Sequence, residues 1–150
     1  MSAPFDAVLT ALRAAAEPTR LRLLALLAQA ELTVGEICQI LGQSQPRVSR
    51  HLKLLCDAEL LDRFREQSFV YYRAPVLGQG RLLLDHVLRL IASDDETLKR
   101  DRARLERVIA ERGRQAASEL RERTSTGSSD SAEIGVLVLS EIVTDPLGRL

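Results

Sequence analysis

The sequence of 150 residues has few aromatic residues, no tryptophan and no long apolar run. Aromatic side chains make up only 3% of the chain, so a hydrophobic core has to be built mainly from Leu, Val, Ile and Ala. No uncharged stretch reaches the ~20 apolar residues that a membrane-spanning helix needs, which predicts a protein without such a helix. Basic and acidic residues balance at 21 each, so any electrostatic preference for a partner has to be local.

Cysteine is also scarce. Two cysteines without a Cys-x-x-Cys pair argue against a disulfide scaffold and against a cluster-binding protein. The first six residues have neither the basic flank nor the apolar run of a secretory signal. With 45% apolar residues, enough to build a core, we expect a folded protein in the reducing cytoplasm.

Helical periodicity dominates from residue 5 to about residue 91 and predicts one domain over residues 5–92. Val8, Leu9 and Leu12 form one apolar stripe, and Pro18 stands where a second helix begins. The apolar positions of that second helix recur at spacings of three and four: Leu21, Leu24, Leu27 and Ala28. We expect Thr33 to cap a third helix that ends at Gly42, and Ser44 to cap a fourth that runs to about Ala58.

The segment from Ile37 to Cys56 contains no acidic residue. Its second helix directs Val48, Leu52 and Leu55 to one side, because residues three and four apart share a helix face. The opposite side carries Arg47, Arg50 and Lys53, with Ser49 beside them. A short helix, a turn at Gly42-Gln43 and a second helix with a basic outer face form the layout of a helix-turn-helix, whose second helix enters the major groove.

A ribbon follows directly. Residues 61–66 and 69–73 are expected to form two strands around Gln67-Ser68, with Arg63, Arg65 and Arg73 on them. Residues 77–91 should form a helix with two apolar faces, which needs a second surface in its own core or in a partner subunit. The fold class is therefore mainly α with a small β-hairpin: a winged helix-turn-helix of order α-α-α-α-β-β-α plus a long C-terminal helix.

The C-terminal part divides into a charged helix at 93–123 and a linker with an apolar tail at 124–150. Ser93 and Glu96 match a capping box at the start of the helix. Its thin apolar stripe is typical equally of a solvated single helix and of a coiled-coil seam. Residues 124–131 have linker composition, and residues 132–150 fit either a helix or a strand.

Three motifs in order resemble the ArsR/SmtB family of bacterial winged-helix repressors. They are Glu17-Pro18-Thr19-Arg20-Leu21-Arg22-Leu23-Leu24, Leu32-Thr33-Val34-Gly35-Glu36-Ile37, and Gln43-Ser44-Gln45-Pro46-Arg47-Val48-Ser49-Arg50-His51-Leu52-Lys53-Leu54-Leu55. Phe69-Val70-Tyr71-Tyr72-Arg73 matches the second wing strand of that family. The resemblance implies a homodimer joined through the N-terminal helix and the helix at 77–91. It also implies a double-stranded DNA operator that is released by a small effector.

The expected DNA contacts follow from the chemistry of the base edges. Arg suits guanine and phosphate, whereas Gln suits adenine. The expected contact residues are Gln43, Ser44, Gln45, Arg47, Ser49, Arg50, His51 and Lys53 from the helix-turn-helix, and Arg65 and Arg73 from the wing. For His51, packing or capping competes equally with DNA contact, because this residue stands at the edge of the inward face.

Three positions depart from the family pattern. Glu59 stands where the family usually has glycine between the recognition helix and the wing, which costs about 1 kcal/mol if the backbone there is left-handed. Ser68 replaces the usual wing-tip glycine, and Phe69 stands where a basic residue is common. These departures weaken the expected phosphate contact of the wing more than that of the helix.

No cofactor and no metal site are expected. The family's arsenic-type Cys-x-Cys positions are Thr33 and Gly35 here, and the adjacent Asp85 and His86 point in different directions on their helix. Cys38 and Cys56 are candidates for a thiol sensor, although a buried structural role is favoured for Cys38. We therefore expect a regulator without catalytic activity.

Two other interpretations stay open. A winged helix can serve as a dimerisation or partner-docking module without specific DNA binding. Residues 145–150 resemble the approach to the first strand of a class I methyltransferase, a domain that some ArsR-type regulators carry after a long helix. The chain would then be the remnant of a methyltransferase fusion, and binding of S-adenosylmethionine would reveal it.

Overall fold

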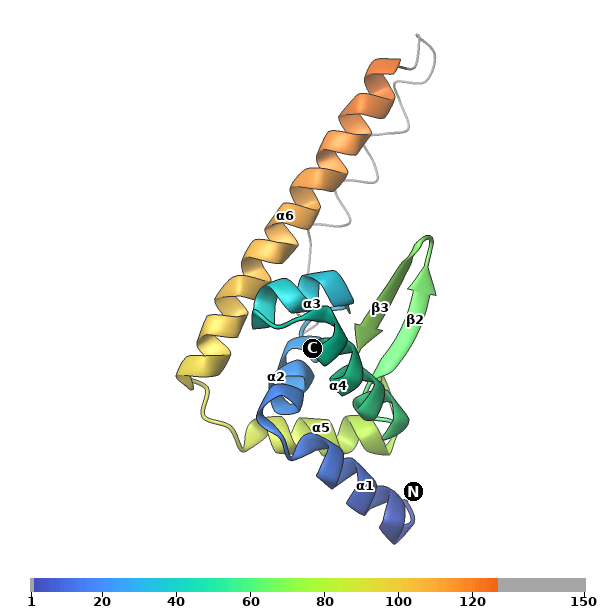
Figure 1. The fold of residues 1–150 in the computed structure, drawn as a ribbon, viewed down its shortest axis with the longest axis vertical. Helices are drawn as coiled ribbons and strands as arrows, with labels where there is room; N and C mark the ends of the chain where they lie inside the picture. Colours follow the sequence, from blue (N-terminus) through green and yellow to red (C-terminus); the bar gives the residue numbers. More distant parts are fainter. Residues whose placement is uncertain (1, 127–150) are drawn as a thin grey trace, which may run out of the picture. The chain divides into compact units, whose positions relative to one another are not determined.

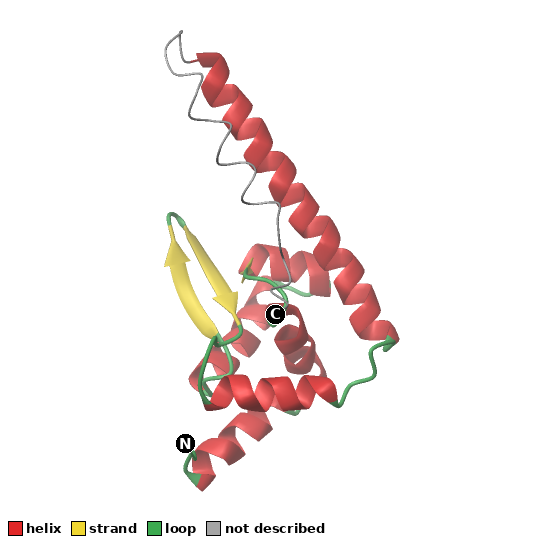
Figure 2. Ribbon diagram, turned by 180° about the vertical axis from the view of Figure 1, so that it is seen from behind, coloured by secondary structure: helices red, strands yellow, loops and turns green. Residues whose placement is uncertain are grey.

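The computed structural model describes residues 2–126, which form a mainly α-helical fold with one small sheet (Figures 1 and 2). The elements follow the predicted order, with one short additional strand. They are α1 (Phe5–Ala15), α2 (Pro18–Leu27), β1 (Leu32–Thr33), α3 (Val34–Leu41), α4 (Gln45–Asp57), β2 (Asp62–Glu66), β3 (Phe69–Arg73), α5 (Gln79–Arg89) and α6 (Glu96–Thr126). Among the described residues, no helix is both long and apolar enough to cross a membrane.

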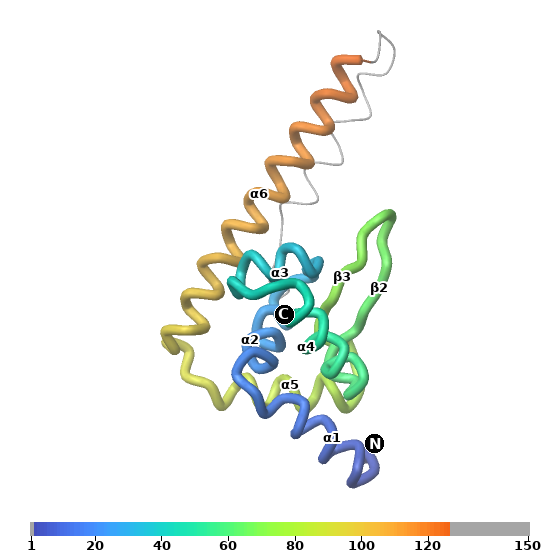
Figure 3. The backbone as a smooth tube through the Cα atoms, in the orientation of Figure 1, coloured from blue at the N-terminus to red at the C-terminus, as the bar shows by residue number. Residues whose placement is uncertain are grey.

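Local signals set the ends of α3 and the start of α4. Thr33 and Glu36 form a capping box, in which the Thr33 Oγ1 accepts from the Glu36 N–H and the Glu36 carboxylate accepts from the Thr33 N–H. Gly42 ends α3 in the left-handed conformation at φ 65°. Ser44 occupies the N-cap of α4, but its side chain makes no capping hydrogen bond. The tube in Figure 3 shows the resulting turn between α3 and α4.

The core surrounds α2. Leu23, Leu24, Leu26 and Leu27 are all buried there, together with Thr19. Because α2 lies between other helices, nearly its whole circumference is covered, and the single stripe expected at Leu21, Leu24, Leu27 and Ala28 understates its burial. The other side of the core comes from α3, α4 and the segments next to them: Leu32, Ile37, Ile40, Val48, Leu52, Leu55 and Leu60.

The sheet has three strands in the order β1-β3-β2, so the expected hairpin is extended by one strand. Leu32 and Thr33 of β1 pair with Tyr72 and Tyr71 of β3. This pairing ties the base of the wing to the start of α3. In the hairpin turn, the left-handed residue is Gln67 at φ 54°.

Helix α5 is shorter than the expected span of 77–91, because Leu77 precedes it and Leu90 follows its last residue. Both of these leucines are exposed, whereas Leu84 is buried. Gly80 lies so close to the backbone of Glu59 that a Cβ atom would stand 2.1 Å from the Glu59 carbonyl oxygen. Glycine at this position therefore lets α5 pack against the end of α4.

Helix α6 begins at Glu96, and its cap differs from the expected one. The Asp95 Oδ1 accepts the N–H of Leu98 at 3.0 Å, so Asp95 rather than Ser93 satisfies the first turn. Asp101 and Leu105 are buried, and the first compact unit of the chain extends to Ala110. Within the second unit, Glu111 and Arg114 form an exposed ion pair at 2.6 Å. Residues 124–126 continue the helix, while the rest of the expected linker and the apolar tail lie outside the described residues.

Candidate nucleic-acid interface

Helix α4 has one buried and one exposed face, as its spacing predicts. Val48, Leu52 and Leu55 are fully buried against the core. Arg47, Arg50 and Lys53 are exposed on the other side. The buried leucines and valine anchor the helix and thereby fix the direction in which the cations point.

The three cations differ in their internal partners. The Lys53 ammonium donates to Asp57 at 2.8 Å, one turn further along α4, and this hydrogen bond raises the pKa of Lys53. Within residues 2–126, the side chains of Arg47 and Arg50 make neither a hydrogen bond nor an ion pair. Two guanidinium groups on α4 are therefore available for an external anion or base edge.

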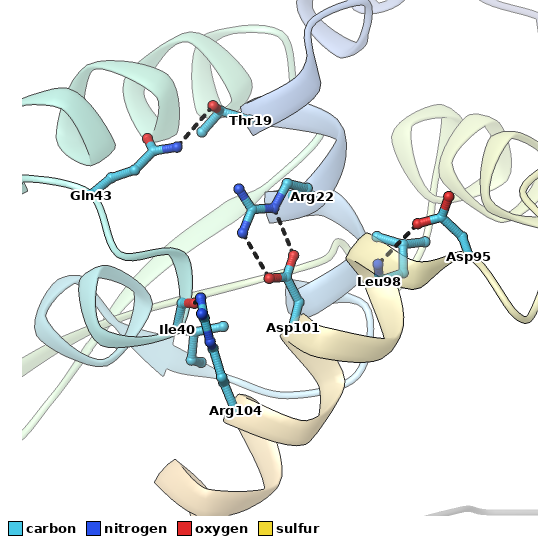
Figure 4. Close-up of polar contacts among 8 residues, drawn as sticks. All are labelled: Thr19, Arg22, Ile40, Gln43, Asp95, Leu98, Asp101 and Arg104. Carbon is cyan, nitrogen blue, oxygen red and sulfur yellow. Dashed lines mark hydrogen bonds and ion pairs between the residues drawn. The ribbon is translucent and has the colours of Figure 1, made fainter.

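The polar residues at and near the start of α4 differ in their exposure. Ser44 and Gln45 are exposed beside the first turn of α4, where backbone N–H groups attract an anion. Gln43 is half-buried, and its Nε2 donates to the Oγ1 of Thr19 on α2 at 3.2 Å (Figure 4). The side chain of Gln43 is thus held against α2. Ser49, on α4 itself, is half-buried.

His51 faces the body of the protein. Its side chain is 14% exposed, and its Nδ1 lies 3.4 Å from Arg20 Nη1 and 3.8 Å from a carboxylate oxygen of Glu17. Arg20 also donates to the backbone carbonyl groups of Arg13 and Ala14 at the end of α1. These contacts favour the packing role of His51 over DNA contact.

Glu17 completes this cluster at the junction of α1, α2 and α4. Its carboxylate caps α2 by accepting the Arg20 N–H at 2.8 Å. Burial opposes ionisation, but the backbone hydrogen bonds from Arg20 and Thr19 and the nearby His51 and Arg20 outweigh it and lower the pKa of Glu17. In the sequence, the Glu17-Pro18-Thr19-Arg20 motif marked this cluster. Helical periodicity could not show that the motif contacts His51, because His51 lies on another helix.

The wing presents its arginines at different places. Arg63 and Arg65 are exposed on β2, and Arg65 pairs across the hairpin with Val70. Arg73 lies at the base of the wing, where its guanidinium forms an ion pair with Glu31 at 3.1 Å and lies 4.5 Å above the ring of Phe64. These contacts hold Arg73 within the fold, so Arg65 is the better placed of the two expected wing contacts.

The two cysteines are both half-buried, on α3 and α4. Burial raises the pKa of the Cys38 thiol, and burial together with nearby Asp57 raises that of Cys56. A raised pKa disfavours the reactive thiolate. Among residues 2–126, no three His, Cys, Asp or Glu side chains gather as metal ligands would.

A groove of about 370 Å³ lies between α1 and α5. Ala7 and Val8 line it from α1, and Leu82, Leu83 and His86 line it from α5. Val8, Leu12 and Leu82 expose large apolar surface on these two helices, and Phe5 does so at 80% exposure. An apolar surface of this kind is typical of a protein–protein contact.

Comparison with known proteins relates the chain to one family. Residues 17–63 match the bacterial regulatory protein, arsR family. The chain is 37% identical over 60 residues to the transcriptional repressor SdpR of Bacillus subtilis, covering 40% of this chain and 67% of that protein. It is 38% identical over 93 residues to the arsenic resistance transcriptional regulator ArsR1 of Pseudomonas putida, covering 60% of this chain and 70% of that protein.

The matched region spans half of another relative, the arsenical resistance operon repressor of Escherichia coli, with 44% identity over 59 residues and 39% of this chain covered. Among solved structures, the homodimeric winged helix-turn-helix DNA-binding domain Mb0332 of Mycobacterium bovis superposes with a TM-score of 0.52 at 30% identity, covering 57% of this chain and 78% of that one. The sequence matches, the order of helices and strands, and the exposed basic face of α4 all lead to the same family and fold. The chain belongs to the ArsR family of bacterial regulatory proteins and carries the winged helix-turn-helix of a DNA-binding transcriptional regulator.

Proposed function

We propose that this chain is a homodimeric transcriptional repressor that binds a two-fold symmetric DNA operator and is released by a small effector. The observation that carries the proposal is the pair of unpartnered guanidinium groups, Arg47 and Arg50, on the exposed face of α4. Lys53 adds a third cation per subunit when phosphate replaces its exposed partner Asp57, which gives six cations in a dimer. Ser44, Gln45 and Arg65 add polar contacts around them. We place this regulator in the cytoplasm and assign it no catalytic step.

The dimer would form through α1 and α5. Support comes from the groove between these helices and from Val8 and Leu82, whose apolar side chains are exposed beside it. A two-fold axis there would set two copies of α4 about 34 Å apart, one turn of DNA. Replacing Val8 or Leu82 with Asp should then give monomers in analytical ultracentrifugation and weaken operator binding, whereas unchanged dimers would exclude this interface.

The first experiment selects bound fragments from the source genome and measures affinity for the enriched site by fluorescence anisotropy. If the six cations of a dimer neutralise phosphates, affinity should fall about 10³-fold between roughly 50 and 200 mM salt. A flat salt response would contradict the proposal. If nanomolar protein retards no fragment, the alternative of a partner-docking module is favoured instead. Small molecules are then screened for release of the enriched fragment.

A second experiment separates base reading from phosphate contact. Arg50→Ala should cost about 1–3 kcal/mol on the enriched site and less on random DNA if Arg50 reads a base. An equal loss on both DNAs would assign Arg50 to phosphate. Arg102→Ala removes an exposed cation from α6 and serves as the matched control, for which we expect unchanged affinity.

A further inference from the structure

The tip of the wing carries an acidic, two polar and one aromatic side chain, but no cation. Glu66 ends β2, Gln67 and Ser68 form the turn, and Phe69 begins β3 opposite Glu66. All four residues are exposed. A carboxylate at this place opposes contact with phosphate, so the tip is poorly suited to act as a backbone clamp.

Phe69 is 58% exposed, although phenylalanine is among the residues that are most often buried. Its ring lies 6.5 Å from that of Tyr71 at an interplanar angle of 60°, and Tyr71 stacks on Phe64 at 5.7 Å. At the other end of this row, the guanidinium of Arg73 lies over the ring of Phe64, 4.5 Å from its centroid. The row of Phe64, Tyr71 and Phe69 therefore holds the exposed ring in a defined position at the end of the hairpin.

Neither the core nor the α1–α5 groove accounts for this ring. Figures 1 and 2 show the β2–β3 hairpin protruding from the helical part of the domain, with its tip directed away from α1 and α5. A dimer through those two helices therefore leaves Phe69 uncovered. The hairpin follows α4 directly in the chain, and exposed Arg63 and Arg65 lie along β2 between α4 and the tip.

We propose that Phe69 is the contact of the wing tip with DNA, its ring lying in the minor groove beside the major groove that α4 occupies. This inference rests on the proposed function. Minor-groove binders insert apolar side chains, phenylalanine among them, between base steps, and they use glutamine side chains to read the groove. Gln67, whose left-handed φ of 54° forms the turn, would supply such a donor next to the ring.

The test compares Phe69→Ala, Phe69→Leu and Glu66→Gln on the enriched operator as a function of salt. Phe69→Ala should weaken binding about 10-fold without changing the slope of log affinity against log salt, because no ion pair is lost. Phe69→Leu keeps an apolar side chain and should recover part of the loss. Glu66→Gln removes only charge and should strengthen binding more at low salt than at high salt.

A second measurement locates the contact in the minor groove. Replacing guanine by inosine in the flanking base pairs removes the 2-amino group from the minor groove and leaves the hydrogen-bonding groups of the major-groove edge unchanged. Wild-type affinity should respond to this replacement, and the affinity of Phe69→Ala should respond much less. Thermal unfolding of each variant checks that the domain is intact.

The outcomes are distinct from failure of the proposed function. If the wild-type protein retards no DNA, the proposed function fails first. If it binds while folded Phe69→Ala binds equally well, or if Phe69→Ala changes the salt slope, the assignment of Phe69 is overturned although DNA binding stands. An equal response of wild type and Phe69→Ala to inosine overturns the minor-groove placement.

Discussion

The guanidinium of Arg22 on α2 donates two hydrogen bonds of 2.7 Å each to the carboxylate of Asp101 on α6 (Figure 4). Asp101 is 2% exposed, and its hydrogen bonds raise the pKa of Arg22 despite partial burial. Three residues further along α6, Arg104 donates to the carbonyl of Ile40 near the end of α3 at 2.9 Å. The first turns of α6 are thus bonded to two helices of the DNA-binding domain.

Removing the Asp101 carboxylate should destabilise the domain. Asp101→Ala leaves the Arg22 guanidinium without its partner, and we expect a loss of about 3 kcal/mol in the free energy of unfolding. Urea denaturation measures it, with exposed Glu106→Ala on the same helix as the control. The double variant Arg22→Met with Asp101→Leu should recover most of the loss, and failure of Asp101→Ala to destabilise would show that the pair contributes little.

Glu59 should be replaceable by glycine with a gain in stability. Its φ is 59°, and it stands where α4 ends in a Schellman motif, since the Leu60 N–H donates to the Leu55 carbonyl at 2.9 Å and the Glu59 N–H to Cys56 at 3.0 Å. Glu59→Gly should raise the free energy of unfolding by about 1 kcal/mol because glycine adopts this conformation without strain. Glu106→Gly, within regular helix, should lower it by about 1 kcal/mol. A loss at both positions would contradict the strain at Glu59.

The contribution of Glu17 should depend on pH in a defined direction. Because the pKa of Glu17 in the folded protein lies below the ordinary value of a glutamate, its carboxylate stabilises the fold above that ordinary value, and the stabilisation is lost as the pH falls through the folded pKa. Glu17→Gln keeps an acceptor at the N-cap of α2 and removes only the charge. It should be less stable than wild type at neutral pH, and the difference in stability should shrink as the pH falls below the ordinary pKa of a glutamate and through the lowered pKa of Glu17. A gap that does not vary with pH would assign the effect to geometry instead of charge.

The two thiols should react slowly. Burial raises the pKa of both Cys38 and Cys56, so both are protonated at neutral pH. We expect alkylation by iodoacetamide to be slower than that of free cysteine, and hydrogen peroxide to leave DNA affinity unchanged. Release of DNA by peroxide that Cys38→Ser or Cys56→Ser abolishes would instead establish a thiol sensor at that residue.

Local sequence determined the helix-turn-helix itself. The spacing of Val48, Leu52 and Leu55 gave the buried face of α4, and that face necessarily placed Arg47 and Arg50 outside. Thr33 and Gly42 marked the ends of α3, because capping and left-handed turns depend on residues within a few positions of each other. The same short-range logic misplaced the cap of α6, where Ser93 and Asp95 are both suitable and only the observed path of the backbone chose Asp95.

Tertiary structure decided which polar side chains remain available for DNA. The sequence left His51 between packing and DNA contact and offered Arg73 as a DNA contact. In the fold, His51 lies beside Glu17 and Arg73 pairs with Glu31, and both partners are far away in the chain. Tertiary packing also buries Asp101 of the highly charged helix α6, because it brings Arg22, 79 residues earlier in the chain, into contact with it. Helical spacing follows from backbone geometry that every residue shares, whereas such pairings depend on how separate elements pack. The sequence therefore determined the face that α4 exposes, and only the packed fold decided which charges on and around that face are already neutralised.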